Sequence, residues 1–289
     1  MHWSTAKMNT YPDGFEENHG SRSEFIRELT LHLLTQQDSR TPDREPETNF
    51  VPRKLVQYWH DHERIPDDVK HCLASWDCLV SQGFEVYRFS DQSAATYISD
   101  RYGKRERQAF ARCWHPAMRS DYLRLCFIFA DGGMYVDADD VLVGDGWQEF
   151  FRNGRLKLQP LCYDIPSAAM VPNMRIWQSD LPTQGRIFYL NNNPIVATEG
   201  HPVLGAALKR ATDRLLAGEP RPEIQETTGP GNLTAALAAH ARNLFAVGNP
   251  LDFEILRDWE AVAETCWDLT YRRDDRNWRN VKAKGRPGR

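Results

Sequence analysis

The chain has 289 residues, with 36 lysines and arginines against 40 aspartates and glutamates, and its formal net charge is −4. This length is enough for one α/β domain with added segments and a sizeable core. A general nucleic-acid binder would normally carry a basic excess, so the mild acidity argues against that class of function.

The cysteines and the hydropathy of the chain bear on where the protein works. No Cys-x-x-Cys pair occurs, which argues against a zinc site, and several cysteines lie in apolar helical patterns typical of reduced thiols in a cytosolic protein. The first residues lack the apolar run of a signal peptide, and no segment has the ~18 consecutive apolar residues of a membrane span. We therefore expect a cytoplasmic protein. The six cysteines are Cys72, Cys78, Cys113, Cys126, Cys162 and Cys266.

Residues 1–49 are expected to precede the main domain as a polar tail, a helix and a linker. The first 20 residues are polar, and we expect them to be loose. From residue 21 to residue 37 apolar side chains recur at helical spacing, with Ser23 as a suitable N-cap. We interpret this segment as a packing helix, with peripheral membrane or partner contact as the alternative. Residues 39–49 have the proline and charge content of a linker.

The main domain is expected between residues 50 and 280, followed by a basic, disordered tail at 281–289. Its first elements alternate strand and helix with short connections, which predicts parallel pairing with right-handed crossovers. The predicted strands are 55–59 and 84–89, and the predicted helices are 66–81 and 91–102. Open α/β sheets bind ligands beyond the carboxyl ends of their strands. Trp59 ends the first strand and is expected at that edge, where it either stacks on a ligand or packs in the core.

A further predicted helix and strand lead directly into an acidic segment. A helix is predicted at 116–130, a tight break at Gly132-Gly133, a short strand at 134–136, and then Asp137-Ala138-Asp139-Asp140. Clustered carboxylates repel each other unless a cation lies among them, and oxygen ligands suit Mg²⁺ or Mn²⁺. A solvated turn after a strand is the alternative interpretation.

The helix before this segment carries Asp121 and Arg124 at i,i+3 spacing, and Ser120 lies one turn before Arg124. A surface salt bridge of little energetic value is the simplest explanation. The rest of the helix is rich in leucine, isoleucine and phenylalanine, however, so its few polar side chains are expected to point at something specific.

The pattern Ser-Asp-x-x-Arg followed by Gly-Gly-x-Tyr-x-Asp-x-Asp resembles the core of glycosyltransferase family 32. Its wider relatives include yeast mannosyltransferases, capsular polysaccharide glycosyltransferases and glucosylating bacterial toxins. The resemblance implies a GT-A-like, Rossmann-like α/β fold, with a mixed sheet flanked by helices and, here, an added N-terminal helix. It implies a hexosyltransferase that uses Mn²⁺ or Mg²⁺ and a UDP- or GDP-sugar donor, with a glycan, lipid or protein acceptor and retention of anomeric configuration.

The resemblance also assigns roles within the two blocks. Asp139 is expected to bind the metal directly, and Asp137 to contact ribose or sugar hydroxyls and the metal. Asp121 and Arg124 are expected to hold the donor sugar, and Trp59 to stack on the nucleotide base. These four charged residues are the predicted catalytic set.

The second half of the chain supplies further candidates by the same resemblance. Asn192 lies in an Asn-Asn-Asn-Pro run after a predicted strand at 186–190, where amides can bind sugar, although Asn-Pro is also a turn signal. Gly229 belongs to a Thr-Gly-Pro loop that opens a helix, whose free N–H groups suit an anion or a hydroxyl. An ordinary capped helix start is the alternative that the local sequence favours. Residues 165–181 have loop composition and are expected on the acceptor side.

The C-terminal segment departs from the family pattern. Relatives have a histidine shortly before a small polar residue and a tryptophan. Here Trp278 is present as a predicted substrate-binding residue, and Asn277 replaces the small residue and is the predicted third metal ligand. Tyr271 or Arg272 stands where the histidine is expected, and two adjacent arginines there could bind a diphosphate. This departure leaves two alternatives: a non-catalytic relative that binds nucleotide sugars or carbohydrate, and a metal-dependent phosphoesterase.

Overall fold

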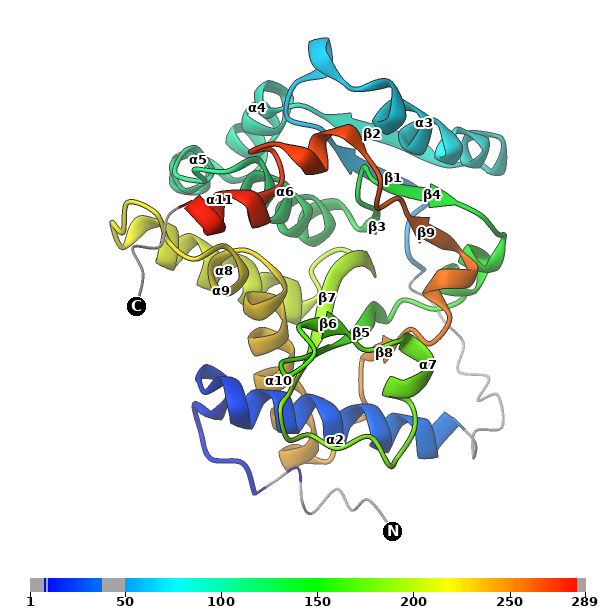
Figure 1. The fold of residues 1–289 in the computed structure, drawn as a ribbon, viewed down its shortest axis with the longest axis vertical. Helices are drawn as coiled ribbons and strands as arrows, with labels where there is room; N and C mark the ends of the chain where they lie inside the picture. Colours follow the sequence, from blue (N-terminus) through cyan, green and yellow to red (C-terminus); the bar gives the residue numbers. More distant parts are fainter. Residues whose placement is uncertain (1–7, 9, 38–49, 285–289) are drawn as a thin grey trace.

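A mixed β-sheet forms the centre of the computed structural model, which describes residues 8, 10–37 and 50–284 (Figure 1). Its seven strands in the described part of the chain lie in the order β2-β1-β3-β7-β5-β6, and β8 pairs with β5. They are β1 (Lys54–Tyr58), β2 (Glu85–Phe89), β3 (Gly133–Tyr135), β5 (Leu156–Asp164), β6 (Ala169–Met170), β7 (Arg186–Ala197) and β8 (Phe253–Ile255). β1 is parallel to β2 and β3, whereas β7 is antiparallel to β3 and β5. The predicted α/β class with a mixed sheet is therefore confirmed.

Helices flank this sheet, as predicted. The α-helices are α2 (His19–Gln37), α3 (Asp67–Ser75), α4 (Asp91–Tyr102), α5 (Lys104–Ala111), α6 (Pro116–Asp131), α7 (Asn173–Ile176), α8 (Pro202–Leu216), α9 (Ile224–Thr227), α10 (Pro230–Val247) and α11 (Trp278–Lys284). Figure 1 shows α2 and α10 at the opposite end of the molecule from α3 and α4. Among the described residues, no helix combines the length and apolar composition that crossing a bilayer requires.

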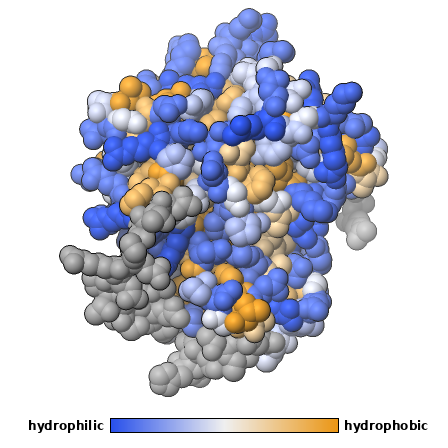
Figure 2. Space-filling model, turned by 180° about the vertical axis from the view of Figure 1, so that it is seen from behind, coloured by the Kyte–Doolittle hydropathy of each residue, from blue (hydrophilic) through white to orange (hydrophobic). Residues whose placement is uncertain are grey.

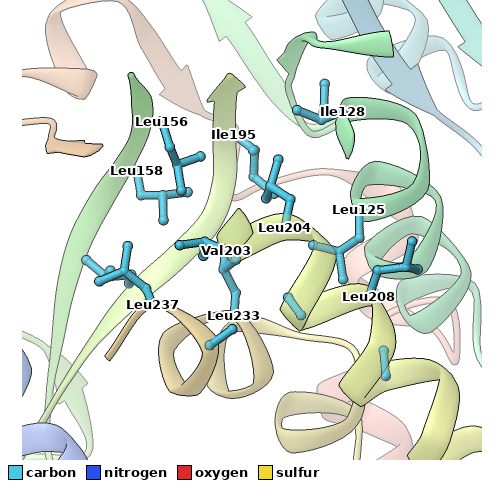
Figure 3. Packing of buried hydrophobic residues seen from close by; sticks show 14 of the residues in the cluster. Leu125, Ile128, Leu156, Leu158, Ile195, Val203, Leu204, Leu208, Leu233 and Leu237 are labelled. Atoms are coloured by element: carbon cyan, nitrogen blue, oxygen red, sulfur yellow. The ribbon is translucent and has the colours of Figure 1, made fainter. Parts of the chain in front are cut away.

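The two faces of the sheet are covered by different kinds of helix. Alternate residues of a strand point to opposite faces. Val56 of β1 and Ile195 of β7 pack into a large cluster with α2, α4, α6, α8 and α10. Figure 3 shows part of this cluster between β5, β7, α6, α8 and α10. The neighbours Leu55 and Val196 face a smaller cluster that contains Trp76, Trp147 and Trp259, which come from short 3₁₀ segments.

The N-terminal helix is part of the main core. It contacts β7 and α10, and Phe25 and Leu29 are buried, so the prediction of a packing helix is confirmed. Ser23 is not its N-cap, because α2 begins at His19 and Ser23 lies inside it. The Ser23 hydroxyl donates to the Arg186 carbonyl and accepts from the Phe188 N–H, which fixes α2 to β7. The predicted linker at 39–49 lies outside the described residues, apart from its junction with the domain at residue 50.

Both ends of the described chain are more ordered than the polar composition predicts. Phe15 is buried within a 3₁₀ turn, because its ring packs on Tyr11 and Phe25. At the other end, α11 continues to Lys284, beyond the predicted end of the domain at 280, while residues 285–289 lie outside the described part. Figure 2 shows a largely hydrophilic surface on the rear face with dispersed hydrophobic residues.

Two features of the sheet differ from the local sequence signals. Residues 186–197 form one strand through Asn193-Pro194, whose peptide bond is cis, because its first half pairs with β5 and its last residues pair with β3. A second, two-stranded sheet joins β4 (Asp140–Leu142) to β9 (Ala263–Thr265). This pairing brings the C-terminal segment next to the acidic segment.

Candidate active site

A cavity of about 600 Å³ lies beyond the carboxyl end of β1 and is shared by the acidic segment, α6, β7 and the C-terminal segment. Ligand sites are expected beyond the carboxyl ends of the strands, and Trp59, Asp137 and Asp139 line this cavity together. The predicted site residues along its wall are Trp59, Asp121, Arg124, Asp137, Asp139, Asn192, Asn277 and Trp278. Gly229 and Asp140 are not among the residues that line it.

The cavity wall formed by α6 begins with a well-defined helix start. His115 is the N-cap, its Nδ1 accepts from the Ala117 N–H, and Pro116 occupies the first helical turn, where its missing N–H costs nothing. Gly132 ends the helix with a φ of 63°. At Gly133 a Cβ would lie 2.6 Å from the Lys54 carbonyl, so only glycine allows β3 to approach β1 this closely.

Arg124 is the centre of a buried polar network. Its Nη2 donates to Asp137 Oδ1 at 2.8 Å and to Ser120 Oγ at 2.8 Å, and its Nη1 donates to the Asn192 carbonyl at 2.7 Å. The guanidinium also lies over the Tyr135 ring, 4.1 Å from its centroid. The explanation of a surface salt bridge is therefore wrong, because the side chain is buried and its bonds connect α6 to β7 and to the acidic segment.

Asp121 lies beside this arginine and is equally buried. Its Oδ1 accepts from Asn192 Nδ2 at 2.8 Å, and its Oδ2 accepts from Thr228 Oγ1 at 3.2 Å. Burial raises the pKa of Asp121 to about 6, although the nearby Arg124 guanidinium opposes the shift. Asp121 is thus held in one orientation by neutral donors from two distant elements.

The three aspartates of the acidic segment have different surroundings. The Asp137 side chain is 33% exposed and pairs with Arg124. Asp139 is more buried, with its side chain 15% exposed, and its Oδ2 accepts from the Tyr271 hydroxyl at 2.6 Å and from Arg272 Nη2. Burial, and then repulsion from Asp137, raises the pKa of Asp139.

Asp140 points away from the cavity and has a structural position. Its Oδ2 accepts from Asn193 Nδ2 at 2.6 Å and its Oδ1 from Thr265 Oγ1 at 2.6 Å, so it connects β7 to β9. Burial, followed by the neighbouring Asp139, raises the pKa of Asp140 to about 7. Asn193 also accepts from the Asp137 N–H at 3.0 Å. Asn193 therefore fixes the main chain of the acidic segment, a role that the sequence analysis missed although the asparagine run was visible.

Trp59 packs in the core and also faces the cavity. It is buried in a small cluster with Val69 and Leu73, and it meets the edge of the Tyr271 ring at 5.2 Å between centroids. It also lines the cavity, and its buried indole N–H has no hydrogen-bond partner among the described residues. A ligand with an acceptor at this position would satisfy that donor.

The remaining predicted residues differ in how they relate to the cavity. Asn192 lines it while bonding Asp121 and Arg124. Gly229 lies behind the wall, where a Cβ would be 3.1 Å from Gln225 Cα, so its small size allows α9 and α10 to pack; the adjacent Pro230 reaches the cavity instead. Trp278 begins α11 at the cavity margin.

Asn277 makes its hydrogen bonds within the C-terminal segment. Its Nδ2 donates to the Arg272 carbonyl at 2.9 Å, and its Oδ1 accepts from the Arg279 N–H at 3.2 Å. The structure therefore brings Asn277 to the cavity without bonding it to the acidic pair. Tyr271 and Arg272, which occupy the region of the family's histidine, contact Asp139 instead.

The chemistry of the acidic segment fits a divalent metal in part. Asp137 and Asp139 offer hard oxygen ligands to the same cavity, and such ligands suit Mg²⁺ or Mn²⁺ when phosphate oxygens complete the shell. In the described residues no group of three or more His, Cys, Asp or Glu side chains is arranged to hold a metal by itself. Two carboxylates leave the other positions of a metal's shell to water or to oxygens of a ligand.

Comparison with known proteins identifies the family to which this region belongs. A family model described as the glycosyltransferase sugar-binding region containing the DXD motif matches residues 66–148. Residues 66–148 therefore belong to the DXD-containing glycosyltransferase family. This region includes α6 and all three aspartates of the acidic segment, and the resemblance inferred from these motifs is confirmed.

Two individual proteins are similar to this chain. The initiation-specific alpha-1,6-mannosyltransferase of Saccharomyces cerevisiae is 22% identical over 200 residues, which cover 60% of this chain and 42% of the relative. The chain thus spans less than half the length of that curated relative. A solved structure named PaToxG Glycosyltransferase covers 91% of this chain and 98% of its own, with 15% identity and a TM-score of 0.46.

Proposed function

We propose that this protein transfers a hexose from a UDP- or GDP-sugar to a glycan, lipid or protein acceptor, with retention of anomeric configuration. One observation carries the proposal. Asp121 and Arg124 of α6 and Asp137 and Asp139 of the acidic segment face one cavity, within the region that matches the DXD glycosyltransferases. Glycan assembly in the cytoplasm is the setting we propose, because all six cysteines are free and four of them are buried.

Sugar transfer requires the donor hydroxyls to be held while the bond to the diphosphate breaks. We assign this task to Asp121 and Arg124. Asp121 is oriented by Asn192 and Thr228, and Arg124 is oriented by Ser120 and Asn192. Because these partners are buried, the two groups need no reorganisation when a sugar binds.

The departing diphosphate requires positive charge. A bound Mn²⁺ or Mg²⁺ supplies it by stabilising the negative charge that develops on the leaving group. We assign Asp139 and Asp137 as the residues that would hold this ion. The exposed edge of Asp137 also suits hydrogen bonds to ribose or sugar hydroxyls, and Trp59, with its unpaired N–H, suits the nucleotide base.

The test uses Asp139→Asn, which removes the charge while keeping an acceptor for Tyr271. We expect Mn²⁺-dependent hydrolysis and transfer from UDP- or GDP-sugars to fall by at least about 100-fold, because losing even a group that only supports a metal ligand typically costs about 10–100-fold. Asp67→Asn is the control, because that aspartate is exposed on α3. Thermal shift with each donor and Mn²⁺ identifies the nucleotide, since bound donor raises the melting temperature.

Two results would contradict the proposal. Full turnover of the wild-type protein in EDTA would remove the metal from the mechanism. Nucleotide-sugar consumption with water as the only acceptor, across glycan, lipid and protein acceptors, would indicate a hydrolase instead.

A further inference from the structure

The Arg272 guanidinium occupies the position next to Asp139 where a cation is needed. Arg272 Nη2 pairs with Asp139 Oδ2, and Arg272 Nε donates to the Cys266 carbonyl at 3.1 Å. The guanidinium also lies over the Trp267 ring at 4.5 Å. Arg272 lines the same cavity as the two aspartates proposed to hold the metal.

Arg124 and Arg272 each form an ion pair with one aspartate of the acidic segment. Arg124 pairs with Asp137, and Arg272 pairs with Asp139. Asp139 therefore already has a positive partner before any metal arrives. A divalent ion bound to the same carboxylate would lie within a few ångströms of the guanidinium, and like charges at that distance in a partly buried site repel strongly.

The two arginines differ in how freely they could yield to a metal. Arg124 is held on α6 by bonds to three elements. Arg272 belongs to a short 3₁₀ turn (Thr270–Arg273), and its backbone is anchored independently of its side chain. Its carbonyl accepts from Asn277 Nδ2 at 2.9 Å and Asn280 Nδ2 at 3.0 Å. The side chain can therefore leave Asp139 without unfolding the turn.

The surroundings of Arg272 suit a bound diphosphate, which would give this arginine an anionic partner other than Asp139. Arg276 and Arg279 line the same cavity, so a diphosphate entering this side would meet three guanidinium groups. Arginine binds phosphate oxygens in a bidentate geometry and keeps its charge at all working pH values.

We propose that Arg272 competes with the divalent metal for Asp139 and, once displaced, binds the diphosphate of the donor. This inference rests on the proposed function, since it takes the metal and the nucleotide as ligands of the same cavity. It predicts that metal and nucleotide assist each other's binding, because the diphosphate stabilises the arginine in the position that frees Asp139. Such coupling is reciprocal between the two ligands.

The experiment is calorimetric titration of the full chain with Mn²⁺ alone, with UDP or GDP alone, and with each ligand at saturating levels of the other. Arg272→Gln removes the competing charge. We expect Mn²⁺ alone to bind about 10-fold more tightly to this variant, and the nucleotide to bind about 10-fold more weakly in saturating Mn²⁺, within the usual range of coupling factors. The mutual enhancement that we expect in the wild-type protein should be absent from the variant.

Arg273→Gln is the matched control. It makes the same change of charge one residue away. Of the two adjacent arginines expected to bind a diphosphate, Arg273 does not line this cavity, because its exposed side chain pairs with Asp268. We expect both affinities of this variant to stay within about 2-fold of the wild type, because screening weakens exposed charges. Tyr271→Phe removes the other donor to Asp139 Oδ2 without a charge change, and it should leave the coupling in place.

Opposite movement of the two affinities in Arg272→Gln supports the proposal. Unchanged or weaker Mn²⁺ binding in that variant would overturn it, because no competitor would have been removed. If Arg272→Gln does not fold, Arg272→Lys serves instead: retained metal–nucleotide coupling supports displacement of a cation, and its loss contradicts it. Failure of the proposed function would look different, since the wild-type protein would then bind neither UDP nor GDP, with or without Mn²⁺.

Discussion

The two walls of the cavity are built in different ways, although each pairs with one aspartate of the acidic segment. The wall from α6 is a long helix in the main core, and its Ser120, Asp121 and Arg124 side chains are buried and hydrogen-bonded. The C-terminal wall consists of β9, a 3₁₀ turn and α11, and Trp267 on it is 61% exposed. The α6 wall is therefore the more rigid of the two, and the C-terminal wall is the more adjustable.

The largest loss of stability is expected from Arg124→Ala in the α6 wall. It leaves Asp121 and Asp137 as buried or half-buried anions without their shared cation. Removing one partner of a buried ion pair typically costs about 3–5 kcal/mol of unfolding free energy. Chemical denaturation measures this loss, and a loss below about 1 kcal/mol, the ordinary value of an exposed pair, would mean that this wall is no more rigid than the other.

A smaller effect on stability is expected at His115, where the two walls meet. His115 caps α6 through Nδ1, and its Nε2 faces the Asp275 carbonyl at 3.0 Å, so the neutral ring with the proton on Nε2 serves both bonds. Burial lowers the pKa of His115. Its contribution to stability is therefore present above the unfolded pKa of about 6.5 and is lost as pH falls towards and through the lower folded value.

The measurement is the unfolding free energy of the wild type and of His115→Asn between pH 8 and pH 5. Asparagine keeps a cap acceptor and does not titrate, so the advantage of the wild type should shrink by about 1 kcal/mol, the usual value of a cap, as pH falls. Parallel curves for the two proteins would show that this histidine does not link the walls in a pH-dependent way.

The smallest effect is expected from Trp267→Ala in the adjustable wall. Its ring stacks on Arg272 while mostly exposed, and cation–π contacts at exposed sites contribute about 0.5–1 kcal/mol. We expect a loss of stability no larger than that, with a rise in KM for the donor and little change in kcat. A loss as large as that of Arg124→Ala would show that the C-terminal wall is as firmly packed as α6.

Much of the rigid wall was predictable from local signals. The helix predicted at 116–130 ends one residue later, and the glycines that follow it adopt positive φ as the break requires. The helix predicted at 91–102 has the observed bounds of α4, and Ser90 caps it. These features depend on neighbours in sequence, namely caps, helical spacing and glycine conformation, which short stretches of sequence encode directly.

The remaining contacts of the site join residues that are far apart in the chain. The sequence by itself determined that three aspartates follow a buried strand after a helix with an acid and an arginine. Only the tertiary structure decided that Asp140 turns inward to Asn193 and Thr265, while Asp139 meets Arg272, 133 residues away. The pairing of β4 with β9 and the continuity of β7 through Pro194 bring these groups together. Such contacts arise from strand registers between distant segments, which local propensity does not specify.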